Sequence, residues 1–389
     1  MDIIYLDNSA TTALSDAAKE AIRAAMENYG NPSSMHAAGL AAGDMLSRAR
    51  SQVAAALGVR NPAPGQIIFT ACGTEANNTA IFGTAYAKAR REANRIVTTD
   101  SEHPSVENAL QKLECDGFEV VRVPTRGGVL DLEAAYAALG EKTLLVTMMM
   151  VNNETGARYD IESVFREAKR RNPQTVTHCD AVQGFLKCKF TPQSLGADLI
   201  SISGHKIHAP KGVGALYIAP ALLKAKKIVP YLIGGGQENG LRSGTENTLG
   251  ITAFGAAAQD GFRHLDEHLA QMNDVRSYAI GQLQEAGFEL NLPQGPCAPH
   301  IVNLRLPDIK SETMLHFLSA QGICISSGSA CSSHAKHASP SLIAFGLTPA
   351  QADMSLRISL CPQNTRGDID ALVEALSRGS QTLVRMRRR

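Results

Sequence analysis

The sequence lacks an excess of charge of either sign, a long apolar run and paired cysteines. Its 389 residues include 38 lysines and arginines and 37 acidic residues, which gives a formal net charge of +1 at pH 7. This balance provides no bulk attraction to nucleic acid or to acidic membranes, so we expect neither as a partner. No apolar run approaches the roughly 18 residues that span a membrane. The first four residues lack the basic region of a signal peptide.

The cysteines indicate a reducing compartment. The chain has 8 of them, scattered along the sequence, and no two form a Cys-x-x-Cys pair. Secreted domains that depend on disulfides carry dense cysteine frameworks, whereas cytoplasmic proteins keep their thiols reduced. We therefore predict a cytoplasmic protein.

Short apolar segments alternate with amphipathic helical stretches, and polar residues gather where the apolar segments end. This pattern predicts an α/β fold with a mainly parallel sheet, whose ligand site lies at the carboxyl ends of the strands. The predicted strands are residues 66–70, 95–98, 144–151, 175–179, 198–203 and 214–218.

The same pattern predicts two domains. Residues 13–250 would form a large domain. After a helical stretch over residues 250–286, a second set of strands and helices predicts a smaller α+β domain of residues 251–389, with residues 1–12 packed against it. The elements of this second set are residues 300–306, 312–321, 355–360 and 367–384.

Lys206 follows the apolar run 198–203 and precedes a glycine-containing turn. A lysine in such a place can anchor a carbonyl cofactor such as pyridoxal phosphate, if its amine is partly desolvated. Most lysines are instead surface residues. Lys206 alone therefore decides little.

Two further segments suit the same cofactor. Asp180 ends another β-branched run, where a carboxylate could hold a pyridine nitrogen protonated, although Asp is also a common helix N-cap. Gly73 and Thr74 open a helical pattern over residues 76–91. Free N–H groups at a helix N-terminus suit a phosphate, although glycine and threonine also mark ordinary helix starts. Together with Lys206, these residues match one phosphorylated pyridine.

At this point the sequence resembles the cysteine desulfurases of the class V aminotransferase family, in particular the branch that serves iron–sulfur cluster assembly and nitrogenase maturation. So many ordered matches make coincidence a poor explanation. The resemblance implies a pyridoxal phosphate enzyme of fold type I, with a mainly parallel seven-stranded sheet in its large domain. The matching segments are residues 5–12, 30–36, 73–78, 102–105, 151–156, 242–247 and 326–332, with those around Asp180 and Lys206.

The resemblance implies a role for each matching residue. Lys206 would be the Schiff-base lysine, Asp180 the partner of the pyridinium nitrogen, and His103 would stack on the ring. Arg357 would grip the substrate carboxylate through its planar fork; the alternative is an arginine paired with an acid at a domain boundary, and the family match favours the substrate role. The remaining matches are Gln183 and Asn153 for the phenolic oxygen or the substrate, Thr74, Ser203 and His205 for the phosphate, and Thr245 for the phosphate in a neighbouring subunit, which implies a homodimer.

Cys331 distinguishes a desulfurase from its relatives, because sulfur abstraction needs a second nucleophile on the protein. Small polar residues surround it, as is typical of a mobile loop. Buried, inert thiols are predicted instead at Cys115 and Cys179. His334 and His337 follow Cys331 at three-residue intervals and could bind a metal or lower the pKa of the thiol. With no fourth ligand in view, we predict no metal there.

The predicted activity is conversion of L-cysteine to L-alanine, with the sulfur left as a persulfide on Cys331 for a sulfur-acceptor protein such as an iron–sulfur scaffold. Lys206 or His103 would move the proton of the substrate α-carbon. The alternatives are a selenocysteine lyase or an aminotransferase on the same scaffold, and a non-catalytic scaffold protein. Cys361 stands where the family commonly has glycine, and we interpret it as inert packing rather than a redox site.

Overall fold

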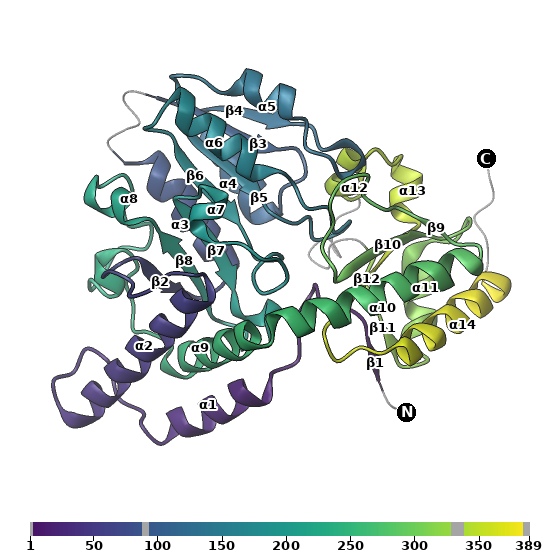
Figure 1. The fold of residues 1–389 in the computed structure, drawn as a ribbon, viewed down its shortest axis with the longest axis horizontal. Coiled ribbons are helices and arrows are strands. Elements are labelled where there is room, and N and C mark those ends of the chain that lie inside the picture. Colours follow the sequence, from purple (N-terminus) through teal and green to yellow (C-terminus); the bar gives the residue numbers. More distant parts are fainter. Residues whose placement is uncertain (1–2, 88–92, 328–337, 384–389) are drawn as a thin grey trace.

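A seven-stranded sheet runs through the larger part of the molecule (Figure 1). The structure is a computed structural model that describes residues 3–87, 93–327 and 338–383. β8 runs in the direction opposite to the other six strands, which are parallel to one another, so the predicted fold class is confirmed. In sheet order the strands are β2 (Ile67–Thr70), β8 (Gly214–Ile218), β7 (Leu199–Ser203), β6 (Val176–Asp180), β5 (Thr143–Met149), β3 (Arg95–Thr99) and β4 (Glu119–Val123).

The central strands are buried along their whole length, which explains their nearly continuous apolar sequences. Every residue of β5, β6, β7 and β8 is buried. Helices cover both faces of such a sheet, so each strand is apolar on both sides. The helices α3 (Gly73–Ala85) and α4 (Pro104–Cys115) cover one face, and α6 (Ile161–Arg171) and α7 (Pro192–Leu195) cover the other (Figure 1).

A row of polar side chains crosses these buried strands. The ring of His178 on β6 lies between two hydroxyls, with Nδ1 2.8 Å from Thr147 Oγ1 and Nε2 2.9 Å from Ser201 Oγ. Burial lowers the pKa of His178 from 6.5 to about 3. The folded protein therefore keeps this ring neutral under conditions in which the unfolded chain protonates it.

Acid should destabilise the protein through His178. Below its ordinary pKa the unfolded state binds one more proton than the folded state, so the free energy of unfolding falls as the pH falls. Between about pH 7.5 and about pH 5 we expect this group to account for a loss of about 2 kcal/mol. The variant His178→Gln should show a shallower decline of the urea midpoint over this range. Equal declines in both proteins would contradict the assignment.

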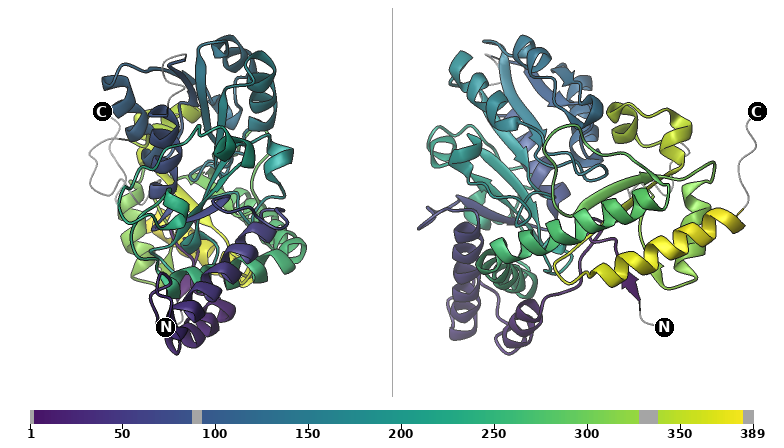
Figure 2. Two further views of the ribbon diagram at one scale, coloured as in Figure 1. Left: turned by 90° about the vertical axis from the view of Figure 1, so that its left-hand side faces the viewer. Right: turned by 45° about the vertical axis from the view of Figure 1, so that its right-hand side comes forward.

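The smaller part of the molecule is built around a three-stranded antiparallel sheet. Its core includes Leu6 together with side chains from residues 275–376, so the N-terminal segment packs here. The long helices α10 (Leu265–Glu285) and α14 (Arg366–Thr382) lie side by side against it (Figure 2). The strands, in sheet order, are β12 (Ser355–Ser359), β10 (Ile301–Arg305) and β9 (Glu289–Leu290), and the short strands β1 (Ile4–Tyr5) and β11 (Ile323–Cys324) pair separately.

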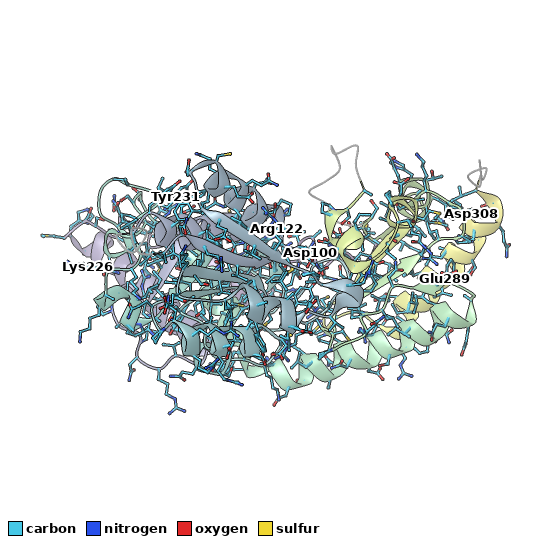
Figure 3. The ribbon with its side chains drawn as sticks, turned by 90° about the horizontal axis from the view of Figure 1, so that it is seen from above. Asp100, Arg122, Lys226, Tyr231, Glu289 and Asp308 are labelled. Carbon is cyan, nitrogen blue, oxygen red and sulfur yellow. The ribbon has the colours of Figure 1, made fainter. Side chains whose placement is uncertain are left out.

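The other helices complete the two parts. Figure 3 shows that the two parts of the molecule lie one after the other along its long axis. Lys226 and Tyr231, in the larger part, lie toward one end, and Glu289 and Asp308, in the smaller part, lie toward the other. The helices are α1 (Asp16–Met26), α2 (Ala37–Ala56), α5 (Leu132–Ala138), α8 (Pro220–Lys224), α9 (Thr248–Arg263), α11 (Ser311–Ser319), α12 (Pro340–Phe345), α13 (Pro349–Asp353) and the 3₁₀ turns η2 (Arg126–Gly128), η3 (Gly204–Lys206) and η4 (Glu238–Gly240).

The predicted domain boundary at residue 250 stays a prediction, and the helix that begins there lies on the large-sheet side. The buried side chains of α9, including Ile251 and Phe254, belong to the core beneath the seven-stranded sheet, and α9 packs against α1 and α2. Within the described residues, no helix combines the length and the apolar character needed to cross a membrane.

Candidate active site

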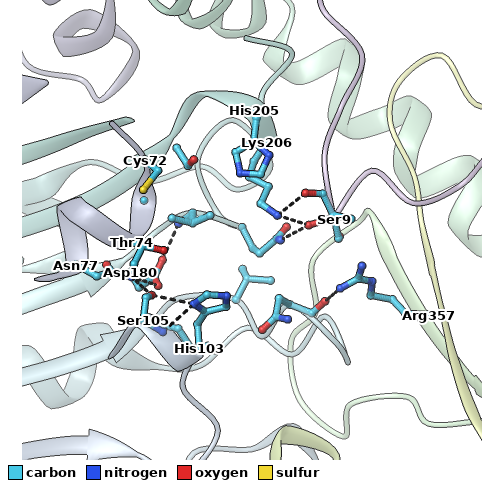
Figure 4. A pocket seen from close by; sticks show the side chains of 18 residues that line it. Ser9, Cys72, Thr74, Asn77, His103, Ser105, Asp180, His205, Lys206 and Arg357 are labelled. Atoms are coloured by element: carbon cyan, nitrogen blue, oxygen red, sulfur yellow. Dashed lines mark hydrogen bonds between the residues drawn. The ribbon is translucent and has the colours of Figure 1, made fainter. Parts of the chain in front are cut away.

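A cavity of about 200 Å³ lies at the carboxyl ends of the central strands (Figure 4). Most of the side chains that the sequence predicted for the site line it, from both parts of the molecule. These are Gly73, Thr74, His103, Asn153, Asp180, Gln183, Ser203, His205, Lys206 and Arg357.

Lys206 enters the cavity from η3, the turn that follows β7. Its Nζ donates hydrogen bonds to the backbone oxygens of Ser9, at 2.5 Å, and Ala10, at 2.8 Å. The N-terminal segment is thus held directly against the amine (Figure 4). The sequence motif around residues 5–12 therefore supplies backbone acceptors to the site.

Asp180 ends β6 and is buried, with both carboxylate oxygens held in place. Its Oδ2 accepts a hydrogen bond from Asn77 Nδ2 at 2.7 Å, and its Oδ1 accepts one from the Val182 amide at 3.0 Å. The second bond closes a turn, so Asp180 caps no helix and the alternative interpretation as an N-cap is not realised. The carboxylate keeps unused lone pairs on the wall of the cavity.

The same network fixes the tautomer of His103. Asn77 also donates to Ser105 Oγ at 2.9 Å, and both the amide and the hydroxyl of Ser105 lie within 3.1 Å of His103 Nδ1. Nδ1 is therefore an acceptor, and the proton of the neutral ring stays on Nε2. Burial lowers the pKa of His103, with Lys206 acting in the same direction and Asp180 opposing it. His103 thus enters the site as a neutral imidazole.

Another part of the cavity wall suits an anion. Gly73 and Thr74 begin α3, so the first amides of that helix have no acceptor within it. A Cβ at Gly73 would lie 2.9 Å from Val182 Cγ2, so no side chain fits there. The buried Ser203 Oγ has no partner among the described residues. Burial, together with nearby lysines including Lys206, lowers the pKa of His205 to about 4, so its ring is neutral.

Arg357 on β12 lines the cavity from the smaller part of the molecule, and it is also paired with an acid. It donates to the backbone oxygen of Asn153 at 2.9 Å and to Asp7 Oδ1 at 2.8 Å. Its side chain is only 2 % exposed, and Nε has no partner among the described residues. The guanidinium of Arg357 therefore faces the cavity and is paired with Asp7 at the same time, and its role in binding the substrate stays a prediction.

Comparison with known proteins agrees with this geometry. The family described as aminotransferase class V matches residues 4–372. The chain belongs to this family. It is 40% identical to a cysteine desulfurase of Trichormus azollae over 380 residues, which cover 97% of this chain and 92% of that protein.

Solved structures of this family have the same fold. A NifS-like protein superposes with a TM-score of 0.90 at 35% identity, covering 98% of this chain and 100% of that chain. A protein described as SspA in complex with cysteine has a TM-score of 0.79 at 31% identity, covering 93% and 99%. The similarity thus extends over both parts of the molecule.

Pyridoxal 5′-phosphate is the cofactor of this class-V family, and the predicted cofactor is therefore confirmed. The residues present fit it. The unpartnered hydroxyl of Ser203 and the free amides beside Gly73 offer donors to a phosphate, and the fixed carboxylate of Asp180 offers an acceptor to a pyridinium nitrogen. Lys206 lies between these groups and the N-terminal segment.

Thr245 is exposed and is not among the residues that line the cavity. Cys331 lies outside the described residues, as do His334 and His337. The described residues on either side of the segment that carries Cys331 contact residues at or next to the cavity wall: the backbones of Ser326 and Arg357 exchange two hydrogen bonds, and Ser339 Oγ donates to Glu154 Oε1 at 2.7 Å.

The other thiols differ in exposure. Cys179 is fully buried as predicted, and burial beside Asp180 raises the pKa of its thiol well above the ordinary value. Cys115 is exposed, so the prediction of a buried thiol there is wrong; it occupies the last turn of α4, beyond the apolar face of the helix. Cys361 is half-buried, and burial raises its pKa as well.

Sequence reasoning missed the residues that hold the functional side chains in place. Asn77 and Ser105 lay in the matching segments without an assigned role, and Asp7 and Ser9 come from the N-terminal motif. The only signal in the sequence for each of these residues was that a polar side chain stands inside a matching segment.

Proposed function

We propose that this protein is a pyridoxal phosphate-dependent cysteine desulfurase, which converts L-cysteine to L-alanine and leaves the sulfur as a persulfide on Cys331. The observation that carries the proposal is the convergence of Lys206, Asp180 and Arg357 on one cavity. Relatives named cysteine desulfurase, which are similar over 97% of this chain, support it. The solved relative in complex with cysteine supports the choice of substrate.

Arg357 is proposed to bind the substrate carboxylate. Its guanidinium is almost fully buried, so water would screen its attraction for an incoming carboxylate only weakly. Asp7 and the Asn153 carbonyl hold two of its nitrogens and so fix the plane of the fork. This orientation would place the substrate amine and α-carbon toward Lys206.

The acid–base work falls to Lys206 and His103. Bound beside Lys206, pyridoxal phosphate would supply a sink for the negative charge that develops on the substrate α-carbon. Asp180 would favour this by holding the pyridine nitrogen protonated. The amine of Lys206 is proposed to remove the α-proton, and the neutral His103 keeps its proton on Nε2 for donation toward the cavity.

Cys331 is proposed as the sulfur acceptor. Its thiolate attacks the substrate sulfur, so a sulfur–sulfur bond forms while the bond between that sulfur and the substrate β-carbon breaks. The β-carbon gains a proton, and the products are alanine and the Cys331 persulfide, with no external oxidant. The flanks of this segment at Ser326 and Ser339 support its access to the cavity.

We further propose a cytoplasmic homodimer that passes sulfur to an acceptor protein, such as an iron–sulfur scaffold. Thr245 would serve the neighbouring subunit's cofactor, which its exposure supports. Tyr231, Leu232 and Ile233, in the same connecting segment, expose apolar side chains, as expected of an interface. The free thiols among the described residues support a reducing compartment.

The test of the proposed function is product formation by the purified protein. With L-cysteine and a thiol reductant, it should show a visible cofactor band and release alanine and sulfide in equal amounts. Keto-acid formation with an amino acceptor would indicate an aminotransferase. A protein that shows no visible band after incubation with pyridoxal phosphate would contradict the proposal and favour a non-catalytic scaffold.

A further inference from the structure

A buried histidine from the small sheet reaches an amide on the wall of the active site. His300 immediately precedes β10 and is completely buried. Its Nε2 lies 3.2 Å from Oε1 of Gln183, in the turn that follows β6. This contact joins the small sheet to the catalytic edge of the large one. Gln183 itself lines the cavity.

The direction of this hydrogen bond follows from the other end of the amide. Gln183 Nε2 donates to the backbone oxygen of Ser9 at 3.0 Å. A flipped amide would set two oxygens against each other there, so Oε1 must face His300. The imidazole therefore donates its Nε2 proton to Oε1. His300 Nδ1 has no partner among the described residues.

His300 stays neutral and keeps this tautomer. Burial lowers its pKa well below the ordinary value, and the nearby charges of Lys187 and Arg357 act in the same direction. A neutral imidazole has a single N–H, and the geometry commits that N–H to Gln183.

The chain of hydrogen bonds continues to the catalytic lysine. The Ser9 oxygen that accepts from Gln183 also accepts from Lys206 Nζ at 2.5 Å. The order is therefore His300, Gln183, Ser9 and Lys206. Each member fixes the orientation of the next, which lets a side chain of the small sheet act on the amine without touching it.

We infer that His300 is a positioning residue that holds the Gln183 amide with its nitrogen toward Ser9 and the cavity. The inference rests on the proposed function, because it concerns how this chain binds pyridoxal phosphate. An amide held at both ends can donate to an anionic oxygen of the cofactor, whereas an amide held by Ser9 alone is less firmly fixed in this orientation. A hydrogen bond donated to this anionic oxygen stabilises the deprotonated form of the cofactor and so lowers the pH at which the cofactor loses its proton.

The experiment compares three substitutions that remove or restore the donor. In His300→Gln, the side-chain nitrogen can occupy the place of Nε2, whereas in His300→Asn it ends one bond short and in His300→Ala it is absent. We expect the pH midpoint of the visible cofactor band to rise by about 0.5 to 1 unit in the Asn and Ala variants. Their affinity for pyridoxal phosphate should fall by about 2- to 10-fold. The Gln variant should restore both quantities.

Two controls separate positioning from packing. His178→Gln changes another fully buried histidine, outside the cavity, and should leave the midpoint unchanged. In a Gln183→Ala background, His300→Asn should cause no additional shift. A wild-type midpoint and affinity in folded Asn and Ala variants would overturn the inference while leaving the proposed function intact. A wild-type protein without a visible band would instead overturn the proposed function and the inference with it.

Discussion

Replacing Lys206 with alanine should abolish alanine formation from L-cysteine, lowering kcat by at least about 1,000-fold. The loss is large because one substitution removes both proposed roles of this amine, which are to anchor the cofactor covalently and to remove the α-proton. Its position supports both roles, since Nζ lies in the cavity and is held by the Ser9 and Ala10 oxygens. The measurement is alanine production at saturating cysteine, together with the visible spectrum of the variant after incubation with pyridoxal phosphate.

Lys211 provides the matched control, because it lies in the same connection between β7 and β8 but is exposed and does not line the cavity. Lys211→Ala should retain the spectrum and the rate of the wild type within about two-fold, since surface substitutions rarely perturb a distant site. A Lys206→Ala protein that keeps substantial turnover would show that another group removes the α-proton. His103, as a neutral imidazole in the same cavity, would then be the residue to replace.

The central sheet could be predicted because its strands carry their own signal. The strands β5 and β7 are fully buried runs of apolar residues with some Ser and Thr, and their predicted bounds differ from the observed ones by at most two residues. β4 was missed because it lies at the edge of the sheet, where its residues are mostly half-buried and its sequence is correspondingly mixed. The helix that was predicted over residues 76–91 begins three residues earlier, at Gly73. The segment of residues 73–75, which the sequence suggested as a turn before the helix, forms its first turn.

The residues that line the cavity could be predicted where the proposed chemistry requires a particular side chain at the end of a strand. Lys206 and Asp180 stand in such places. The positioning contacts could not be predicted, because they join residues far apart in the sequence. The bond between Arg357 and Asp7 spans 350 positions, and that between His300 and Gln183 spans 117. A pattern along the chain contains no information on which distant polar group completes a buried hydrogen bond, and the fold alone supplies it.

Replacing Cys331 with alanine should leave the cofactor band unchanged and reduce desulfuration of L-cysteine by at least about 100-fold, because the nucleophile that takes the sulfur is lost. Substrate binding should persist, since Arg357 and Lys206 are untouched. The direct readout is mass spectrometry of the protein after one turnover, in which the wild type gains one sulfur on Cys331 and the variant gains none. Alanine release measured in parallel reports turnover.

Cys361→Ala provides the matched control for this thiol. Cys361 is half-buried, burial raises the pKa of its thiol, and it does not line the active-site cavity, so its removal should not affect sulfur transfer.

Selenocysteine as a substrate distinguishes a cysteine desulfurase from a selenocysteine lyase. A selenocysteine lyase would release alanine from selenocysteine and cysteine alike without Cys331, because no protein nucleophile takes part. If Cys331→Ala forms alanine from L-cysteine at the wild-type rate, Cys331 is not the sulfur acceptor and the lyase becomes the better description. A loss confined to L-cysteine would establish that Cys331 accepts the sulfur, since only that step requires a second nucleophile on the protein.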